Sequence, residues 1–327
     1  MKLSVIIPVF NGGEGLRRGL EALAASSRPP DEVIVVDDGS TDTSGTLAAG
    51  LGARVISLAD GPRGPARARN LGAAAATGDL LIFLDADVVV HPATLAGMEE
   101  YLSAHPEVSA LFGSYDEGPE APGLVSRYKN LLHHYVHQHS RPEASTFWTG
   151  CGAIRRRIFA ALGGFDESQR MLEDIELGLR LREAGHLIRL CPWIQVTHLK
   201  SWTFSGLLQA DIRDRAIPWT RLILRQKRLP ADLNLDVRGR LGALAAWAAL
   251  LFFVLGFYSA PAWLGLFAAA AALLALNHDL YRFFARHGSP GFTAGAIGLH
   301  TLYLLYSSLT FVLVAGRERF RRRWSKR

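Results

Sequence analysis

Two aspartates separated by one residue, Asp85 and Asp87, follow an apolar run in the segment FLDADVVV. Carboxylates at this spacing are suited to a divalent cation such as Mg²⁺ or Mn²⁺, which favour oxygen ligands. The same spacing suits an aspartyl-phosphate phosphatase, in which the first aspartate after a buried strand is the nucleophile. A second pair, Glu173 and Asp174, opens the helical pattern EDIELGLRL, where an acidic residue is ordinarily a cap. These four carboxylates are the first candidates for catalysis.

Polar residues follow two further apolar runs. The first run contains Pro8 and Phe10 and ends at Asn11, and the second ends in DDGSTD, which includes Asp38. Acidic groups that converge repel one another and are costly to desolvate, so they persist most readily around a cation. We therefore expect these segments to meet the Asp85 segment at one site.

Alternating strands and helices are predicted to position these residues. Continuous apolar strands indicate burial on both faces, which predicts an α/β, Rossmann-like, mostly parallel sheet sandwiched by helices. In such sheets ligands bind at the carboxyl ends of the strands. The predicted strands cover residues 4–10, 32–38, 54–58 and 79–90, and the predicted helices cover 15–25, 43–51 and 66–76.

Charge is distributed unevenly along the 327 residues, whose net charge is +6 and whose mean hydropathy is +0.13. Residues 1–200 hold 19 basic and 24 acidic side chains, a net charge of −5. The basic excess lies in 201–240 and 317–327, at +4 and +6. This argues against a nucleic-acid partner, which needs the charge on the folded domain, and favours anionic lipid. Two cysteines and no CxxC predict a reduced, cytosolic head.

The last third of the chain has the composition of membrane helices. Residues 241–276 carry no charge over 36 positions, and 287–316 carry none over 30, where about 20 suffice to cross a bilayer. Pro261 divides the first stretch into a predicted hairpin, Leu241–Phe257 and Ala262–Leu276, and Phe292–Ala315 is predicted as a single span. Three spans would leave the basic tail outside and two would return it to the cytosol. The number of spans stays open.

The predicted organisation is a head over 1–200, an amphipathic interfacial segment over 201–240, two or three transmembrane helices over 241–316 and a basic tail over 317–327.

Five motifs occur in order over residues 3–186: VIIPVFNGG, VIVVDDGSTD, GPARARNLGAAAATGDLLIFLDADVVV, TGCGAIRRRIFAALGGFDE and EDIELGLRLREAG. In kind, order and spacing they resemble the inverting family 2 glycosyltransferases with the GT-A fold. The resemblance implies transfer of a sugar from a nucleoside-diphosphate sugar, with a divalent metal, Mg²⁺ or Mn²⁺, at the leaving diphosphate.

The resemblance also assigns donor-binding roles. Asp38 would accept a hydrogen bond from the nucleobase. Arg69 would reach the nucleotide, although a helix-face salt bridge is the alternative for this residue. Asp85 would contact the ribose or the metal, and Asp87 would bind the metal. The remaining donor-binding residues implied are Pro8, Phe10 and Asn11.

Catalytic and acceptor roles follow from the same resemblance. Asp174, beside Glu173, would be the general base that deprotonates the acceptor. His198 would add a metal or phosphate contact, with a structural core histidine as the equal alternative. Gln195 is followed by VTHLKSW, which lacks the Gln-x-x-Arg-Trp pattern of processive members, so transfer of a single sugar is favoured. The implied acceptor pocket consists of Gly150, Cys151, Gly152 and Trp202.

A histidine cluster in the segment LLHHYVHQH could also suggest zinc. No HExxH pattern and no nearby cysteine accompany it, so we favour a helix that frames the acceptor site. The cluster consists of His133, His134, His137 and His139.

The main hypothesis is a membrane-anchored, multi-pass glycosyltransferase with a cytosolic head. Tethering favours a lipid or polyprenyl-phosphate acceptor at the cytosolic membrane face. Two alternatives remain: a haloacid-dehalogenase-like phosphatase that uses Asp85, and a non-catalytic nucleotide-binding membrane scaffold.

Overall fold

The computed structural model describes residues 1–58, 61–169, 171–226 and 237–324. The parts of the two basic segments at 227–236 and 325–327 lie outside the described residues. The chain divides into two compact units. We call them the sheet unit, Met1–Ala121 with His137–Ser201, and the helical unit, Pro122–Val136 with Trp202–Arg327.

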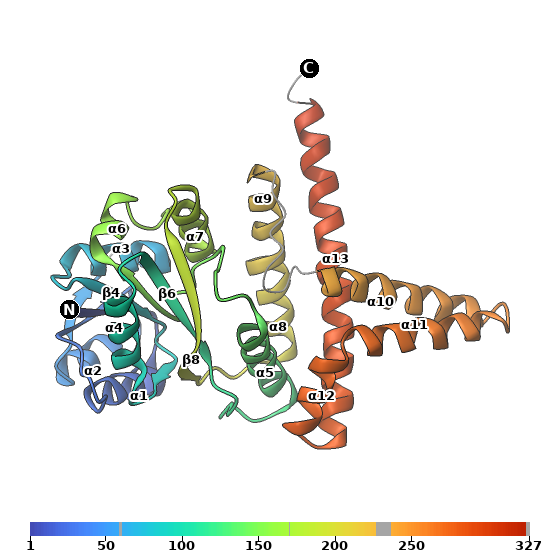
Figure 1. Cartoon of the computed structure of the whole chain (residues 1–327), viewed down its shortest axis with the longest axis horizontal. Coiled ribbons are helices and arrows are strands. Elements are labelled where there is room, and N and C mark those ends of the chain that lie inside the picture. Colours follow the sequence, from blue (N-terminus) through green and yellow to red (C-terminus); the bar gives the residue numbers. More distant parts are fainter. Residues whose placement is uncertain (59–60, 170, 227–236, 325–327) are drawn as a thin grey trace. The chain divides into compact units, whose positions relative to one another are not determined.

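The sheet unit is built on one eight-stranded sheet with the order β3-β2-β1-β4-β7-β6-β8-β5 (Figure 1). Neighbours are parallel from β3 to β4 and between β6 and β8, whereas β7 is antiparallel to β4 and β6, and β5 is antiparallel to β8. The strands are β1 (Leu3–Val9), β2 (Glu32–Asp37), β3 (Arg54–Ser57), β4 (Leu80–Leu84), β5 (Val88–Val90), β6 (Val108–Tyr115), β7 (Cys151–Arg155) and β8 (Leu187–His198).

The single strand predicted over 79–90 is wrong, because the chain forms two strands there. β4 ends at Leu84, and a turn closes where the Val88 amide donates to the Asp85 carbonyl at 3.2 Å. β5 then pairs with β8 rather than continuing beside β1. Polar aspartates gain little from a buried ladder position, so the segment leaves the sheet at the point where it can present them to solvent or ligand.

Helices cover both faces of the sheet, as the sequence predicts (Figure 1). Along β1, Val5 and Ile7 belong to one buried core and Ile6 to the other, because successive strand side chains point to opposite faces. α1 and α4 supply leucines to the first core, and α3, α6 and α7 supply residues to the second. The helices of this unit are α1 (Gly13–Ala24), α2 (Ser44–Gly50), α3 (Pro65–Ala75), α4 (Thr94–Ala104), α6 (Arg156–Ala161) and α7 (Glu173–Glu183).

The helical unit consists of α-helices and one π-helix segment, η1. α5 begins in this unit and ends in the sheet unit. α8, η1 and α9 occupy the segment predicted to be amphipathic. The bounds are α5 (Leu124–His139), α8 (Phe204–Gln209), η1 (Ala210–Ala216), α9 (Ile217–Gln226), α10 (Val237–Gly256), α11 (Ala262–Leu276), α12 (His278–Arg286) and α13 (Pro290–Trp324).

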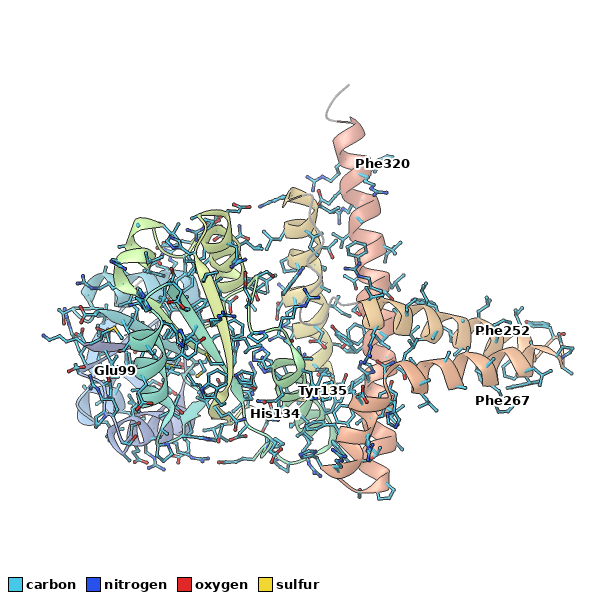
Figure 2. The ribbon with its side chains drawn as sticks, viewed as in Figure 1. Glu99, His134, Tyr135, Phe252, Phe267 and Phe320 are labelled. Atoms are coloured by element: carbon cyan, nitrogen blue, oxygen red, sulfur yellow. The ribbon has the colours of Figure 1, made fainter. Side chains whose placement is uncertain are left out.

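The predicted hairpin around Pro261 is present, with α10 and α11 packed against each other (Figure 2). Phe252 of α10 covers Gly265 of α11, where a Cβ atom would lie 2.5 Å from the ring. Phe267 is 68% exposed, and Leu264 is 73% exposed. Large exposed apolar side chains on two packed helices are typical of a membrane-facing surface.

Two described helices, Val237–Gly256 and Pro290–Arg321, are long and apolar enough to cross a membrane. A third span is possible if Ala262–Leu276 and His278–Arg286, which meet at 70°, count as one. This leaves the choice between two and three spans open. α13 continues to Trp324, so the described part of the predicted basic tail is an extension of this helix.

Candidate active site

The carboxyl ends of β1, β2 and β4 meet at one edge of the sheet. Val9 pairs with Asp37 across the parallel β1–β2 ladder, and β4 runs parallel on the other side of β1. The segments after these strands therefore converge, which places Asn11, Asp38 and Asp85 along the same edge. The candidate site lies at this edge.

Asn11 locks the first two segments together. Its backbone is left-handed at φ 56°, a conformation that asparagine tolerates better than most residues. Its Oδ1 accepts from the Thr41 amide at 2.8 Å, and its own amide donates to Ser40 Oγ at 3.0 Å. Asn11 thus holds the loop after β2. Pro8 lies on β1, and Phe10 is 50% exposed beside the loop, so its ring is accessible to a ligand.

Asp38 is buried and holds the loop that precedes α3. Its carboxylate accepts from the Arg63 amide at 2.9 Å and from the Gly64 amide at 2.7 Å. Both oxygens therefore have backbone donors in this state. Recognition of a nucleobase by Asp38 stays a prediction, and it requires these hydrogen bonds to be shared or exchanged.

Arg69 connects two of the predicted carboxylates. It is only 4% exposed, and its Nη2 donates to Asp85 Oδ1 at 2.6 Å while its Nη1 donates to Glu173. Arg69 thus forms salt bridges from α3, as the alternative expected, but they are buried and join two of the predicted site carboxylates. Its buried Nε–H has no acceptor among the described residues. Buried donors are ordinarily paired, so this group points to a missing ligand atom.

Asp174 and Glu173 lie at the start of α7, after Leu172 in a left-handed conformation at φ 66°. Asp174 Oδ2 is 3.4 Å from both the amide and the hydroxyl of Thr149. Burial raises the pKa of Glu173 to about 7, against the opposing charge of Arg69. Burial likewise raises the pKa of Asp174, again against Arg69, and the charge of Asp85 adds to the increase. One guanidinium therefore faces three carboxylates, which favours proton uptake or a further cation.

Asp87 has a different partner. His198 Nε2 lies 3.6 Å from Asp87 Oδ2, and the His198 ring stacks on Tyr115 with centroids 4.2 Å apart. Burial acts to raise the pKa of Asp87, but His198 and the charge of Lys200 outweigh it, so the pKa lies below its usual range. Asp85 and Asp87 are 35% and 37% exposed. Both can reach a ligand from the edge of the sheet.

The described residues hold no group of three or more His, Cys, Asp or Glu side chains arranged to bind a metal. This applies to the histidine cluster as well. His137 Nδ1 contacts the Gly113 carbonyl at 3.0 Å, and His134 stacks on Phe283 with centroids 5.8 Å apart. These two histidines make contacts within the fold and do not converge on a common metal position.

The predicted acceptor residues separate into two groups. Gly150 and Gly152 leave room for Trp148, since a Cβ atom on Gly150 would lie 2.3 Å from that ring. Cys151 is fully buried between them, and burial raises the pKa of its thiol, as expected of a small core residue. Trp202 belongs to the helical unit, where its amide donates to Ser126 Oγ at 2.8 Å.

Sequence reasoning missed Tyr115, whose ring stacks on that of His198. The signal was available, because Tyr115 is the last residue of β6 and therefore stands at a sheet edge. An aromatic residue ending a fully buried strand is a candidate for stacking on a functional side chain.

Comparison with known proteins supports the fold and matches part of the chain to a known family. Residues 4–163 match the family described as glycosyl transferase family 2. These residues are just under half of the chain, and the family assignment applies to them. A mannosyltransferase from Pyrobaculum calidifontis, in complex with GDP-Man and Mn²⁺, has a similar fold, with a TM-score of 0.58 at 20% identity. The match covers 95% of this chain and 87% of that one.

Two curated relatives of the chain are named as a glycosyltransferase and a rhamnosyltransferase. The pre-mycofactocin glycosyltransferase of Mycobacterium tuberculosis is 33% identical over 270 residues, which cover 75% of this chain and 54% of the relative. This chain thus spans about half the length of that relative. An O-antigen chain rhamnosyltransferase of Salmonella typhimurium is 26% identical over 238 residues, which cover 67% of this chain and 74% of the relative.

Proposed function

We propose that the chain is a membrane-anchored, metal-dependent, inverting glycosyltransferase. It transfers one sugar from a nucleoside-diphosphate sugar to a hydroxyl or phosphate of a lipid-linked acceptor at the cytosolic membrane face. The observation that carries the proposal is the cluster at the carboxyl edge of the sheet, where Arg69 faces Asp85, Glu173 and Asp174. A site with this excess of carboxylates is suited to a cationic partner and to proton transfer.

Asp85 and Asp87 are the residues that would hold Mg²⁺ or Mn²⁺, with His198 behind Asp87. Their oxygens suit either ion, and two carboxylates are the usual protein share when substrate phosphates and water complete the coordination. Once bound, the ion stabilises charge on the leaving diphosphate. The buried Nε–H of Arg69 is then available to a donor oxygen. The similarly folded mannosyltransferase was determined with GDP-Man and Mn²⁺, the classes of donor and ion proposed here.

Asp174 is proposed as the general base. Its raised pKa makes it a stronger proton acceptor than an exposed aspartate, and Thr149 holds one of its oxygens. Asp174 takes the proton of the acceptor hydroxyl while that oxygen attacks the anomeric carbon opposite the diphosphate. A single displacement of this kind inverts the configuration and needs no carboxylate nucleophile.

We also propose that the segment before the first span and the end of α13 lie on the same, cytosolic side of the membrane. Within the helical unit, Arg221 Nε of α9 lies 3.4 Å from Glu318 Oε1 of α13. If the chain crosses the membrane an even number of times between α9 and the end of α13, both residues of this contact lie on one side. The basic end of α13 is then cytosolic, in agreement with the positive-inside rule. A cysteine introduced by Phe320→Cys should react with an impermeant reagent only from the cytosolic side. Reaction only from the outside would contradict this topology.

A lipid-linked acceptor is supported by the apolar helices and by one relative that acts on O-antigen chains. The phosphatase alternative receives no support, because the family match covers the Asp85 segment and Asp85 is paired with Arg69. The scaffold alternative predicts donor binding without turnover.

A thermal-shift panel tests the proposal, with UDP-, GDP- and dTDP-sugars each added with and without Mn²⁺. A ligand that binds the folded chain raises its melting temperature. We expect one nucleotide class to raise it, and to do so more strongly with Mn²⁺. Asp87→Asn should remove the Mn²⁺ effect, while Glu100→Gln on the exposed face of α4 should retain it. A panel without any metal-dependent shift would contradict the proposal.

A further inference from the structure

A pocket of about 370 Å³ lies between α9 and the C-terminal end of α13, entirely within the helical unit. Three of its five lining residues are arginines, and the only acid among them is Glu318. Arg221 and Arg225 are four residues apart on α9, so they share one helix face. The lining residues are Arg221, Leu224, Arg225, Glu318 and Arg321.

The charge of this pocket is not balanced. Glu318 pairs with Arg221 at 3.4 Å, but Arg225 and Arg321 have no acidic partner among the described residues. Two arginines that converge on one pocket repel each other unless an anion lies between them. The planar guanidinium offers paired donors that match the oxygens of a phosphate.

An apolar track leads from the pocket along α13. Val314 precedes Glu318 by four residues and Phe311 precedes it by seven, which places both on the pocket face of the helix. Phe311 is 36% exposed. Because helical side chains lean toward the N-terminus, Arg321 reaches back toward this apolar surface. Phe320, which is 63% exposed, marks the outer end of the same segment (Figure 2).

We propose that this pocket binds the phosphate of an anionic membrane lipid, whose acyl chains lie along the apolar track of α13. A free anion would use the arginines but not the track, whereas a lipid uses both. Basic pockets beside membrane helices on the cytoplasmic side are suited to such headgroups. This lipid site is separate from the proposed transfer reaction. The two proposals share one premise, that the helical unit contacts a bilayer.

The test uses the full chain in neutral detergent micelles doped with phosphatidylglycerol, phosphatidylcholine or no lipid, with inorganic phosphate as a separate arm. Lipid affinity is taken from the lipid-dependent rise in melting temperature. We expect phosphatidylglycerol to stabilise the chain more than phosphatidylcholine. The double variant Arg225→Gln with Arg321→Gln should weaken phosphatidylglycerol binding at least about tenfold, because two charge-assisted contacts are lost.

Two further variants make the test specific. Arg282→Gln with Arg286→Gln removes the same charge from exposed positions of α12 and should leave the affinity unchanged. Glu318→Gln removes the only acid of the pocket lining and should tighten binding. The proposal is overturned if the α12 variant loses as much affinity as the pocket variant, if Glu318→Gln weakens binding, or if inorganic phosphate stabilises the chain as much as phosphatidylglycerol. Lipid binding is measured without sugar transfer, so its failure is distinguishable from failure of the transferase proposal.

Discussion

Among the described residues, each unit of the chain contains a buried cluster of charged groups, and these two clusters differ in charge balance. In the sheet unit, Arg69 contacts Asp85 and Glu173, with Asp174 close by. In the helical unit, Lys129 donates to Asp211 Oδ1, and the Tyr306 hydroxyl donates to Asp211 Oδ2 at 2.5 Å. Burial is similar, since Arg69 and Glu173 are 4% and 5% exposed and Lys129 and Asp211 are 8% and 5% exposed. The two clusters therefore differ in the charges that they contain and not in how deeply they are buried.

The balanced cluster is complete without a ligand. One cation and one carboxylate cancel, and each oxygen of Asp211 has a donor. The other cluster has three carboxylates for one cation, and the Nε–H of Arg69 lacks an acceptor among the described residues. Buried charges are stable only when they are paired. The balanced cluster therefore holds helices together by itself, whereas the proposed function has substrate and metal complete the unbalanced one.

The largest expected effect is on catalysis. Asp174→Asn removes the proposed base and should lower the rate of transfer by about 10²- to 10⁴-fold, while donor affinity changes little. Steady-state kinetics with separate donor titration checks this. Glu183→Gln, on the exposed last turn of α7, is the control and should retain full activity. Near-normal turnover in Asp174→Asn would refute the assignment.

A large effect on stability is expected only in the helical unit. Asp211→Asn leaves Lys129 buried without a full charge partner and should lower the free energy of unfolding by about 3 kcal/mol or more. Asp174→Asn should lower it by far less, because it relieves repulsion among carboxylates. Unfolding in detergent measures both. Asp214→Asn, three residues further along η1, is the matched control. If Asp211→Asn and Asp174→Asn lower the free energy of unfolding equally, the two clusters do not differ in their contribution to stability.

An intermediate effect is expected on metal affinity. His198 lies behind Asp87, and replacing a residue that orients a metal ligand typically costs about 10- to 100-fold in affinity. We expect this loss in His198→Asn for Mn²⁺, measured by titration in the presence of the nucleoside diphosphate. His105→Asn, at a half-buried position directly after α4 and outside the candidate site, should leave the Mn²⁺ affinity unchanged. If His198→Asn leaves the Mn²⁺ affinity unaltered, His198 has a structural role in the core and none in metal binding.

The smallest effect is on the pH dependence of stability. The pKa of Glu173 is about 7 in the folded chain against an ordinary value of 4.5, so the folded state binds more protons between these values. Stability should therefore fall as pH rises from about 4.5 to 7. The melting temperature of the metal-free chain measures this slope. Glu173→Gln should flatten it, and a slope that Glu173→Gln leaves unchanged would assign the pH dependence to another group.

The sequence predicted β1 to β4 and α1 to α3, because apolar strands alternate there with helical patterns and motifs mark the strand ends. It made no prediction for β6, β7 and β8, which complete the sheet. It missed the break between β4 and β5. The apolar residues on both sides of Asp85 and Asp87 look like one strand, and only the pairing of Val88 with His198 separates them.

The site was predicted in part. The carboxylates could be named from their motifs, but the environment of Arg69 could not, because its burial depends on Glu173, which lies 104 residues further along the chain. Lys129 and Asp211 carry no motif at all, and their pairing is set by the packing of α5 against η1. Contacts between distant segments of this kind are fixed by tertiary structure rather than by local pattern.

Transfer itself is the most direct test of the account. The full chain, reconstituted in vesicles that contain membrane lipid extract, is incubated with Mn²⁺ and the labelled nucleotide-sugar that stabilises it most. We predict that label enters the organic phase, that it does so only with the divalent ion, and that Asp87→Asn and Asp174→Asn abolish it. Transfer that persists at the wild-type rate in both variants, or a donor that stays intact with every lipid fraction, would contradict the account.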